Sequence, residues 1–133
     1  MSFLLDTNVW ISYLKSPNSP AARRIEQADP SQIVLCAVVK AELFYGAFKS
    51  PRPIENLALL DRIFSRFVSL PFGDDAARRY GEIRAALESR GTPIGPNDLM
   101  IAASASANGA ILVTHNTAEF SRIAGLTLDD WMT

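Results

Sequence analysis

Short apolar runs alternate with longer amphipathic segments along this chain, and this alternation restricts its fold more than any other feature. The runs typical of buried strands are Phe3–Leu5, Ile33–Leu35, Val68–Phe72 and Ile111–Val113, with Leu126–Leu128 as a fifth candidate. The segments between them are long enough to form helices that return the chain to the start of the next strand. This order indicates a parallel sheet covered by helices on both faces. We therefore predict an α/β protein with three layers, α/β/α, around a short, mostly parallel sheet of four to five strands.

The helices are predicted from apolar residues three and four positions apart and from residues that start or stop helices. Asp74 or Asp75 is expected to cap one of them, and the charge pairs Arg78–Glu82 and Arg84–Glu88 on the same helix are typical of a solvated face. No repeat or flexible linker divides the chain, so we expect a single domain over residues 1–133. The expected helices run from Val9 to before Pro17, Ser19 to about Ala28, Val38 to Phe48, Ile54 to Phe67, Ala76 to Leu87, Asn97 to about Ala107 and Ala118 to Ile123.

Composition restricts the environment of the protein. Hydrophobic residues make up 48% of the chain and charged residues 20%, as in a folded globular protein. There is no run of eighteen apolar residues and no basic leader before the first strand, so we expect neither a membrane span nor a signal peptide. The only cysteine, Cys36, follows an apolar run and is expected to be a core thiol in a reducing compartment. We therefore expect a cytoplasmic protein.

Net charge gives little information about a partner. The formal charge is −1, from 13 basic and 14 acidic residues, which by itself does not indicate a polyanionic ligand. If bound cations neutralise three of the acids, the remaining surface becomes slightly positive. The charge balance therefore permits nucleic acid without indicating it.

Three carboxylates, those of Asp6, Glu42 and Asp98, stand beside the most hydrophobic segments of the chain. Each has a structural explanation when taken alone: Asp6 as a helix cap, Asp98 in a first turn, and Glu42 on a solvated helix face. A distant arginine that pairs with one of them is a further alternative. Taken together, they match the oxygen ligands that a hard divalent cation takes from separate elements of a fold. Ligands of such sheets bind beyond the carboxyl ends of the strands, where Asp6 and the turn Thr114–Asn116 are expected.

Four segments of the chain resemble the signature segments of PIN-domain ribonucleases, and most closely those of VapC toxins from bacterial toxin–antitoxin pairs. They are Leu4–Asn8, Lys40–Ala47, Gly95–Ala102 and Leu112–Phe120, in the same order over essentially the whole chain. The resemblance implies a PIN-like fold and a metal-dependent endoribonuclease. It also implies that Asp6, Glu42 and Asp98 hold Mg²⁺, or alternatively Mn²⁺, and that cleavage leaves a 5′-phosphate and a 3′-hydroxyl.

The chain departs from the family pattern at the fourth acidic position, commonly Asp, where it has Asn116. Asn116 can donate a neutral oxygen or orient a metal-bound water, and Glu119, one helical turn further on, is a candidate fourth acid. His115 is expected to be peripheral or an RNA contact, because metal-dependent hydrolysis does not require it as a general acid or base. The residues expected beside the ligands or against the substrate are Thr7, Asn8, Thr114 and His115, with Thr114 as a support of the ligands or a phosphate contact.

The resemblance also implies partners. VapC-like proteins act on RNA and are inhibited by a small VapB-like antitoxin, and the family leads us to expect a homodimer, a larger assembly with the antitoxin, and contact with operator DNA only through the antitoxin. Basic side chains that could hold an RNA backbone are Lys15, Arg23 and Arg24. The apolar surface for an antitoxin is expected around Trp10, Phe44, Tyr45 and Phe48, although core packing explains these aromatic residues equally well.

Other classes fit the residues less well. A haloacid-dehalogenase-type phosphatase needs a second Asp two positions after the first, where this chain has Asn8, and a receiver domain needs an acidic pair at the end of the first strand. A more serious alternative is a catalytically weak PIN-like module that binds RNA or an antitoxin without turnover, which Asn116 favours. The sequence does not identify the RNA.

Overall fold

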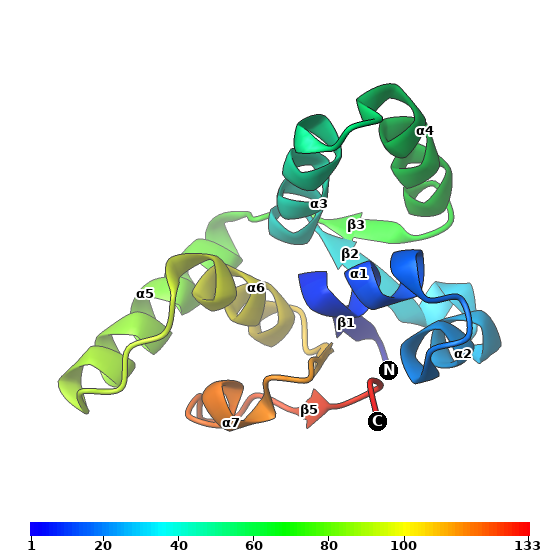
Figure 1. The fold of residues 1–133 in the computed structure, drawn as a ribbon. Coiled ribbons are helices and arrows are strands. Elements are labelled where there is room, and N and C mark those ends of the chain that lie inside the picture. The colour runs from blue at the N-terminus through cyan, green and yellow to red at the C-terminus, as the bar shows by residue number, and fades with distance from the viewer.

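The five strands form a single sheet in which every neighbouring pair is parallel, in the order β3-β2-β1-β4-β5 (Figure 1). The computed structural model describes residues 1–133. The central strands are apolar on both faces, as expected for a sheet covered on both sides. The strands are β1 (Phe3–Leu5), β2 (Ile33–Cys36), β3 (Val68–Leu70), β4 (Ile111–Val113) and β5 (Leu128–Asp129). The prediction of a three-layer α/β/α fold is confirmed, and the sheet is parallel throughout.

Seven α-helices surround the sheet, and three of them begin with a proline. Proline suits this position because it has no backbone N–H, and the N–H groups of a first helical turn have no partner within the helix. Asp6 and Ser19 cap the first two helices through their side-chain oxygens. The helices are α1 (Thr7–Lys15), α2 (Pro20–Gln27), α3 (Ala37–Lys49), α4 (Pro53–Phe64), α5 (Asp74–Ser89), α6 (Pro96–Ala107) and α7 (Thr117–Phe120), and a short 3₁₀ turn covers Pro30–Gln32.

The order of the strands defines a switch point between β1 and β4. From β1 the chain moves to β2 and then to β3, and it returns to the other side of β1 only for β4 and β5. With right-handed crossovers, α1 to α4 cover one face of the sheet and α5 to α7 cover the other. Figure 1 shows α5 beside α6 and α3 beside α4 as separate pairs, in agreement with their contacts. Ligands of open α/β sheets bind at such a switch point, beyond the carboxyl ends of the strands.

Several predicted boundaries differ from the structure. Strand β3 ends before Pro71, β5 begins two residues later than expected, and α7 ends at Phe120 rather than at Ile123. Helix α4 ends at Phe64, although Phe67 beyond it is still buried. An apolar residue at helical spacing can thus belong to the loop that follows a helix.

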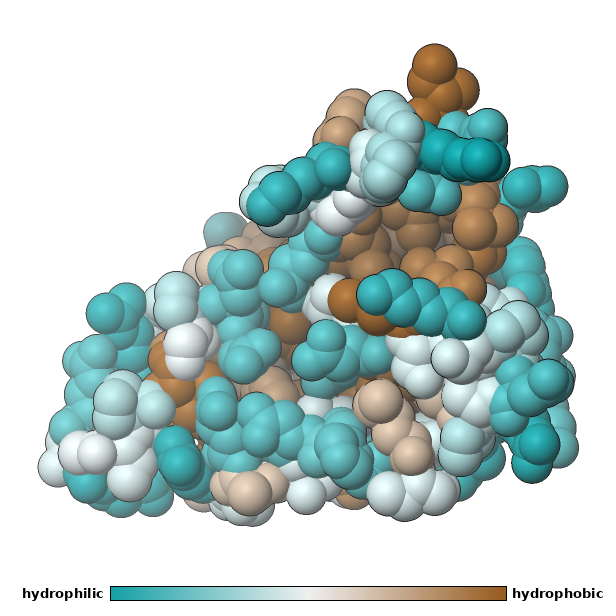
Figure 2. Space-filling view, viewed as in Figure 1, coloured by the Kyte–Doolittle hydropathy of each residue, from teal (hydrophilic) through white to brown (hydrophobic).

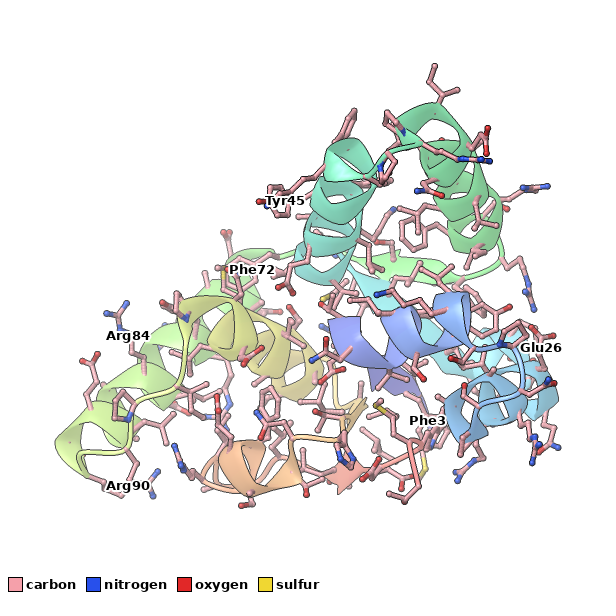
Figure 3. All side chains as sticks on the ribbon, in the orientation of Figure 1. Phe3, Glu26, Tyr45, Phe72, Arg84 and Arg90 are labelled. Carbon is pink, nitrogen blue, oxygen red and sulfur yellow. The ribbon has the colours of Figure 1, made fainter.

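Two predictions about α5 are wrong. Asp74 and Asp75 do not cap this helix, because Gly73 occupies the cap position and both acids lie in the first turn, where a carboxylate favours the helix dipole. Glu82 pairs with Arg79, three residues before it, and not with Arg78. The second expected pair is present, with Arg84 Nε 3.0 Å from Glu88 Oε2. Figure 3 shows Arg84 on the outer side of α5 and Arg90 at the end of this helix, where its side chain donates to the backbone carbonyl of Arg122.

One hydrophobic core supports the sheet and includes Leu4, Leu112 and the thiol of Cys36, which is free and buried as predicted. Trp10 also belongs to this core and packs against Phe67, with the ring centroids 5.4 Å apart. The expectation that Trp10 forms part of a binding surface is therefore wrong. No helix combines the length and the apolar composition needed to cross a bilayer.

The burial of α6 predicts a large loss of stability for Ile101→Ala. Ile101 is 1% exposed, so truncation leaves a cavity and should lower the free energy of unfolding by about 2–5 kcal/mol in urea denaturation. Ile54→Ala is the matched control, because Ile54 is 83% exposed in α4 and its truncation should change stability by less than about 0.5 kcal/mol. Equal losses for the two variants would contradict the assigned core.

Candidate active site

Asp6 lies directly after β1 at the switch point and is only 7% exposed. Its Oδ1 accepts a hydrogen bond from the backbone N–H of Val9, at 3.2 Å, which caps α1. Its Oδ2 accepts a hydrogen bond from the Thr114 hydroxyl, at 2.5 Å, across the gap between β1 and β4. The carboxylate is therefore fixed from two elements that are 108 residues apart in sequence.

Thr114 is fully buried, which determines what it can do. Its hydroxyl donates to Asp6 and accepts from the backbone N–H of Asn116, at 3.0 Å. A side chain with no exposed surface cannot contact a phosphate, so that alternative does not fit the structure. Thr114 orients the Asp6 carboxylate and shapes the turn after β4.

Glu42 comes from the second turn of α3 and is held by α1. The hydroxyl of Thr7 donates to Glu42 Oε1 at 2.6 Å. Lys40, the basic residue nearest to Glu42 in sequence, lies over the ring of Phe64, at 5.4 Å from its centroid. No ion pair in the structure involves Asp6, Glu42 or Asp98, so the alternative of a neutralising arginine does not apply.

Asp98 lies in the first turn of α6 and completes the wall of a hollow of about 730 Å³. We call this the acidic hollow, because Asp6, Glu42 and Asp98 all line it and no lysine or arginine does. The three predicted carboxylates thus come to one place from the end of β1, from α3 and from α6. The other lining residues are Thr7, Asn8, Ile11, Ala37, Val38, Ala41, Tyr45, Asn97 and Met100.

The carboxylates of the acidic hollow repel each other. Burial raises the pKa of Asp6, Glu42 raises it further, and the hydrogen bonds from Thr114 and from backbone N–H groups oppose these effects. Burial, followed by the charges of Glu119, Asp6 and Glu42, raises the pKa of Asp98 to about 6. Glu119 is therefore electrostatically part of the same site. A bound cation would favour the ionised form of every member.

Asn116 and His115 line a second hollow, of about 460 Å³, on the other side of Asp6. We call it the His115 hollow, and it shares Asp6, Asn8 and Ile11 with the acidic hollow. The side-chain Nδ2 of Asn116 donates to Glu119 Oε2 at 3.2 Å. Asn116 thus lies outside the acidic hollow and holds the acid that interacts with Asp98.

The donors present suit a hydrated divalent cation. No three acidic, histidine or cysteine side chains converge on a point that would hold an ion directly. Mg²⁺ usually keeps several of its waters and takes only one or two protein carboxylates, so direct convergence of three is not required. Asp6 and Glu42 retain oxygen lone pairs beyond the hydrogen bonds that they accept. The donor set, the raised carboxyl pKa values and the lack of a neighbouring cationic side chain all fit such an ion.

The predicted basic contacts are not at these hollows. Arg24 lies over the ring of Trp131, at 5.0 Å, and pairs with Asp129, at 3.7 Å. Lys15 lines a third hollow, between α1, α3 and α4, and Arg23 is exposed on α2. No lysine or arginine therefore lines the acidic hollow, and Lys15 shares only the third hollow with Glu42.

Sequence reasoning missed the C-terminal segment. Asp130 Oδ2 lies 3.0 Å from His115 Nδ1, and Met132 lines the His115 hollow. The rule that drew attention to Asp6 applies here too, because Asp130 follows the last strand at the carboxyl edge of the sheet. The only sequence signal for Asp130 is its place directly after β5, and this strand of two residues is too short to be recognised from a periodic pattern.

Comparison with known proteins defines the class of this fold and site. The family model described as PIN domain matches residues 3–126. The chain is 44% identical to the tRNA(fMet)-specific endonuclease VapC of Shigella flexneri, with 98% of each chain covered. It is 39% identical to the protein of the same name from Salmonella typhimurium, again with 98% of each covered. The chain belongs to the VapC branch of the PIN-domain family.

Solved structures agree with this assignment. The DNA-bound VapBC crystal structure from Salmonella typhimurium matches with a TM-score of 0.92 at 39% identity, and 98% of each chain is covered. VapBC2 from Rickettsia felis, bound to a DNA fragment from its promoter, matches with a TM-score of 0.91 at 37% identity over 98% of this chain and 99% of that chain. The fold is therefore shared along the whole length of these relatives.

The raised pKa of Asp98 predicts how the stability of the cation-free protein depends on pH. A carboxyl group whose folded pKa of about 6 exceeds its ordinary 3.8 stabilises the fold at low pH, and this contribution is lost as the pH rises through about 6. Asp98→Asn removes the effect. In urea denaturation with EDTA, Asp98→Asn should therefore gain stability relative to wild type as the pH increases from about 5 to about 7.

The control for this measurement is Asp61→Asn, which removes an exposed acid from α4 and corrects for the loss of one negative charge. If the difference in free energy of unfolding between Asp98→Asn and wild type stays constant across this pH range, the pKa of Asp98 is not raised by the fold.

Proposed function

We propose that the protein is a metal-dependent endoribonuclease. The observation that carries this proposal is the acidic hollow, in which Asp6, Glu42 and Asp98 meet at the switch point without any neighbouring cationic side chain. Such an arrangement destabilises the protein unless a cation compensates it. The relatives that match nearly the whole chain carry the names of endonucleases, which supports the same activity.

Asp6, Glu42 and Asp98 are proposed to hold Mg²⁺, for which Mn²⁺ can substitute, and Glu119 supplies the fourth carboxylate. Thr114, Thr7 and Asn116 orient Asp6, Glu42 and Glu119 through the hydrogen bonds that they donate. A divalent cation at this site supplies a Lewis acid for a phosphodiester oxygen and a source of hydroxide near neutral pH. No side chain of the protein is then needed as the nucleophile, and the expected products carry a 5′-phosphate and a 3′-hydroxyl.

Transfer RNA is the first substrate to test, because the relatives from Shigella flexneri and Salmonella typhimurium are named as specific for tRNA(fMet). The proposal places the protein in the cytoplasm, where cellular RNA is accessible, and assigns the activity to one domain formed by residues 1–133. Charge alone favours no particular RNA, since the two hollows beside Asp6 contain no lysine or arginine.

A VapB-type antitoxin is the proposed inhibitory partner. The matching structures from Salmonella typhimurium and Rickettsia felis are VapBC complexes. In this chain, the third hollow offers an apolar surface between α1, α3 and α4, and Figure 2 shows hydrophobic side chains gathered there. We call it the apolar hollow. Its apolar side chains are Ile11, Leu14, Leu43, Ala47, Leu59 and Leu60. Tyr45 and Phe48 are exposed nearby on α3, and Tyr45 projects away from α4 (Figure 3).

Asp6→Asn should abolish metal-dependent cleavage and leave the fold intact, because Asn also caps helices. The rate of cleavage of a purified transfer RNA in Mg²⁺ should fall at least about a hundredfold. Thr114→Val removes the hydroxyl that donates to Asp6 and accepts from the backbone N–H of Asn116, and it should lower activity or metal affinity about 10- to 100-fold. The measurement is fragment formation on a denaturing gel, followed by analysis of the product ends.

EDTA provides the control for the metal, and Arg78→Ala, on the exposed face of α5, controls for preparation. Undiminished cleavage by pure Asp6→Asn protein would rule out the assigned site. Binding of RNA by wild type without any fragments in Mg²⁺ or Mn²⁺ would favour a PIN-like binding module. Because Asn116 holds Glu119 beside Asp98, the loss of the usual fourth aspartate is a weaker argument for that module than the sequence suggests.

Leu59→Asp should separate inhibition from catalysis. A charge in the apolar hollow should weaken binding of a VapB-type partner at least about tenfold, while RNA cleavage by the isolated protein stays unchanged. Ala85→Asp, at an exposed position of α5, introduces the same charge elsewhere and serves as the control. Calorimetric titration with the partner measures the effect, and equal binding by all three proteins would place the partner elsewhere.

A further inference from the structure

The His115 hollow has a composition unlike that of the acidic hollow. It combines the imidazole of His115 and the apolar side chains of Ile11 and Met132 with the polar groups of Asn8, Ser12 and Asn116. Its volume of about 460 Å³ lies within the usual range of ligand pockets, roughly 300–1,000 Å³. No lysine or arginine lines it, so it is poorly suited to a phosphate. An aromatic ring, apolar walls and amides are the groups that bind unpaired nucleobases.

The imidazole of His115 is held in place although the residue is exposed. Its Nδ1 lies 3.0 Å from Asp130 Oδ2, and because an ionised carboxylate only accepts hydrogen bonds, Nδ1 is the donor. The other oxygen of Asp130 accepts from the backbone N–H of Met132, at 2.8 Å. Asp130 thus fixes both the ring of His115 and the last turn of the chain.

A buried tryptophan anchors this C-terminal segment. Trp131 packs on Phe3 of β1, with centroids 5.2 Å apart, and its Nε1 donates to Asp129 Oδ2 at 3.0 Å. The guanidinium carbon of Arg24 also lies over the Trp131 ring, 5.0 Å from its centroid. The C-terminal segment, which holds His115 through Asp130 and lines the hollow with Met132, is therefore fixed in place. Fixed aromatic and amide groups lose little freedom on binding, which favours selective recognition.

We propose that the His115 hollow binds one unpaired nucleobase next to the cleaved phosphodiester bond, with the base stacked on His115 and the ring positioned by Asp130. The proposal rests on the proposed function, since it takes the cleaved bond to lie at the acidic hollow. Asp6, Asn8 and Ile11 line both hollows, so one RNA strand can place its phosphate against the first and the adjoining base in the second. His115 is then a specificity residue, and Asp130 acts through it as a positioning residue.

The test uses short RNA strands that contain the cleaved bond, in which each flanking nucleotide in turn is replaced by an abasic one. At one position, the replacement should raise KM for the wild type about 5- to 100-fold, the range of one base–aromatic stack, with kcat nearly unchanged. His115→Ala should raise KM on the intact strand by a similar factor and should be insensitive to the abasic nucleotide at that position. Asp130→Asn should raise KM by a smaller factor and should weaken the effect of the abasic nucleotide at the same position. Arg78→Ala should leave KM unchanged.

Dissociation constants of the same strands, measured by fluorescence anisotropy in EDTA, separate this proposal from the nuclease assignment. If wild type cleaves the strands, but the effects of His115→Ala and of the abasic nucleotide are independent and multiply at every position, base recognition by His115 is wrong and the nuclease assignment stands. Coupled effects on binding without any cleavage would support base recognition and overturn the nuclease. Neither binding nor cleavage by wild type would overturn both.

Discussion

The hydrogen bond from Thr114 to Asp6 is the interaction on which the site depends. It joins the ends of β1 and β4, the parallel neighbours that form the switch point of the strand order. Both side chains are buried. Asp6 also caps α1, so the same carboxylate sets the start of the helix that carries Thr7 and Ile11. Moving Asp6 would therefore change the support of Glu42 and the walls of both adjoining hollows.

The carboxylates of the acidic hollow lower the stability of the folded protein, and interactions elsewhere in the fold must compensate for this. A carboxylate as buried as Asp6 is normally paired with a base, yet its partners here are a hydroxyl and a backbone N–H. Charged hydrogen bonds reduce this cost but do not cancel it, since the pKa values of both Asp6 and Asp98 remain raised. The dense core around Leu4, Leu112 and Ile101 provides the stability that tolerates this repulsion. A site that is unfavourable when empty has the most to gain from a divalent ion.

The sequence predicts the fold well because the three central strands are short, apolar and separated by helices, which leaves few alternatives. The sequence also groups Asp6, Glu42 and Asp98, because all three stand beside apolar segments and fall in segments that resemble PIN-domain signatures, whereas the rule about strand ends points only to Asp6 among them. The bond between Thr7 and Glu42 could not be predicted, because it depends on how α1 is rotated against α3. The burial of Trp10 could not be predicted either, because amphipathic spacing alone does not distinguish a core residue from one on a docking surface. The role of Asp130 was hidden by the two-residue strand β5, which is too short to show a periodic pattern.

Helix α1 connects the three hollows, and this arrangement links inhibition to chemistry. Ile11 lines all of them, and Glu42 lines both the acidic and the apolar hollow. A partner helix that fills the apolar hollow therefore contacts Glu42, one of the proposed ligands, and lies next to the acidic hollow through the shared residue Ile11. Because no lysine or arginine lines the acidic hollow, a guanidinium or ammonium group of a partner would compete there with the proposed metal ion. The lack of positive charge that favours the proposed cation thus also favours binding of a basic residue of a partner.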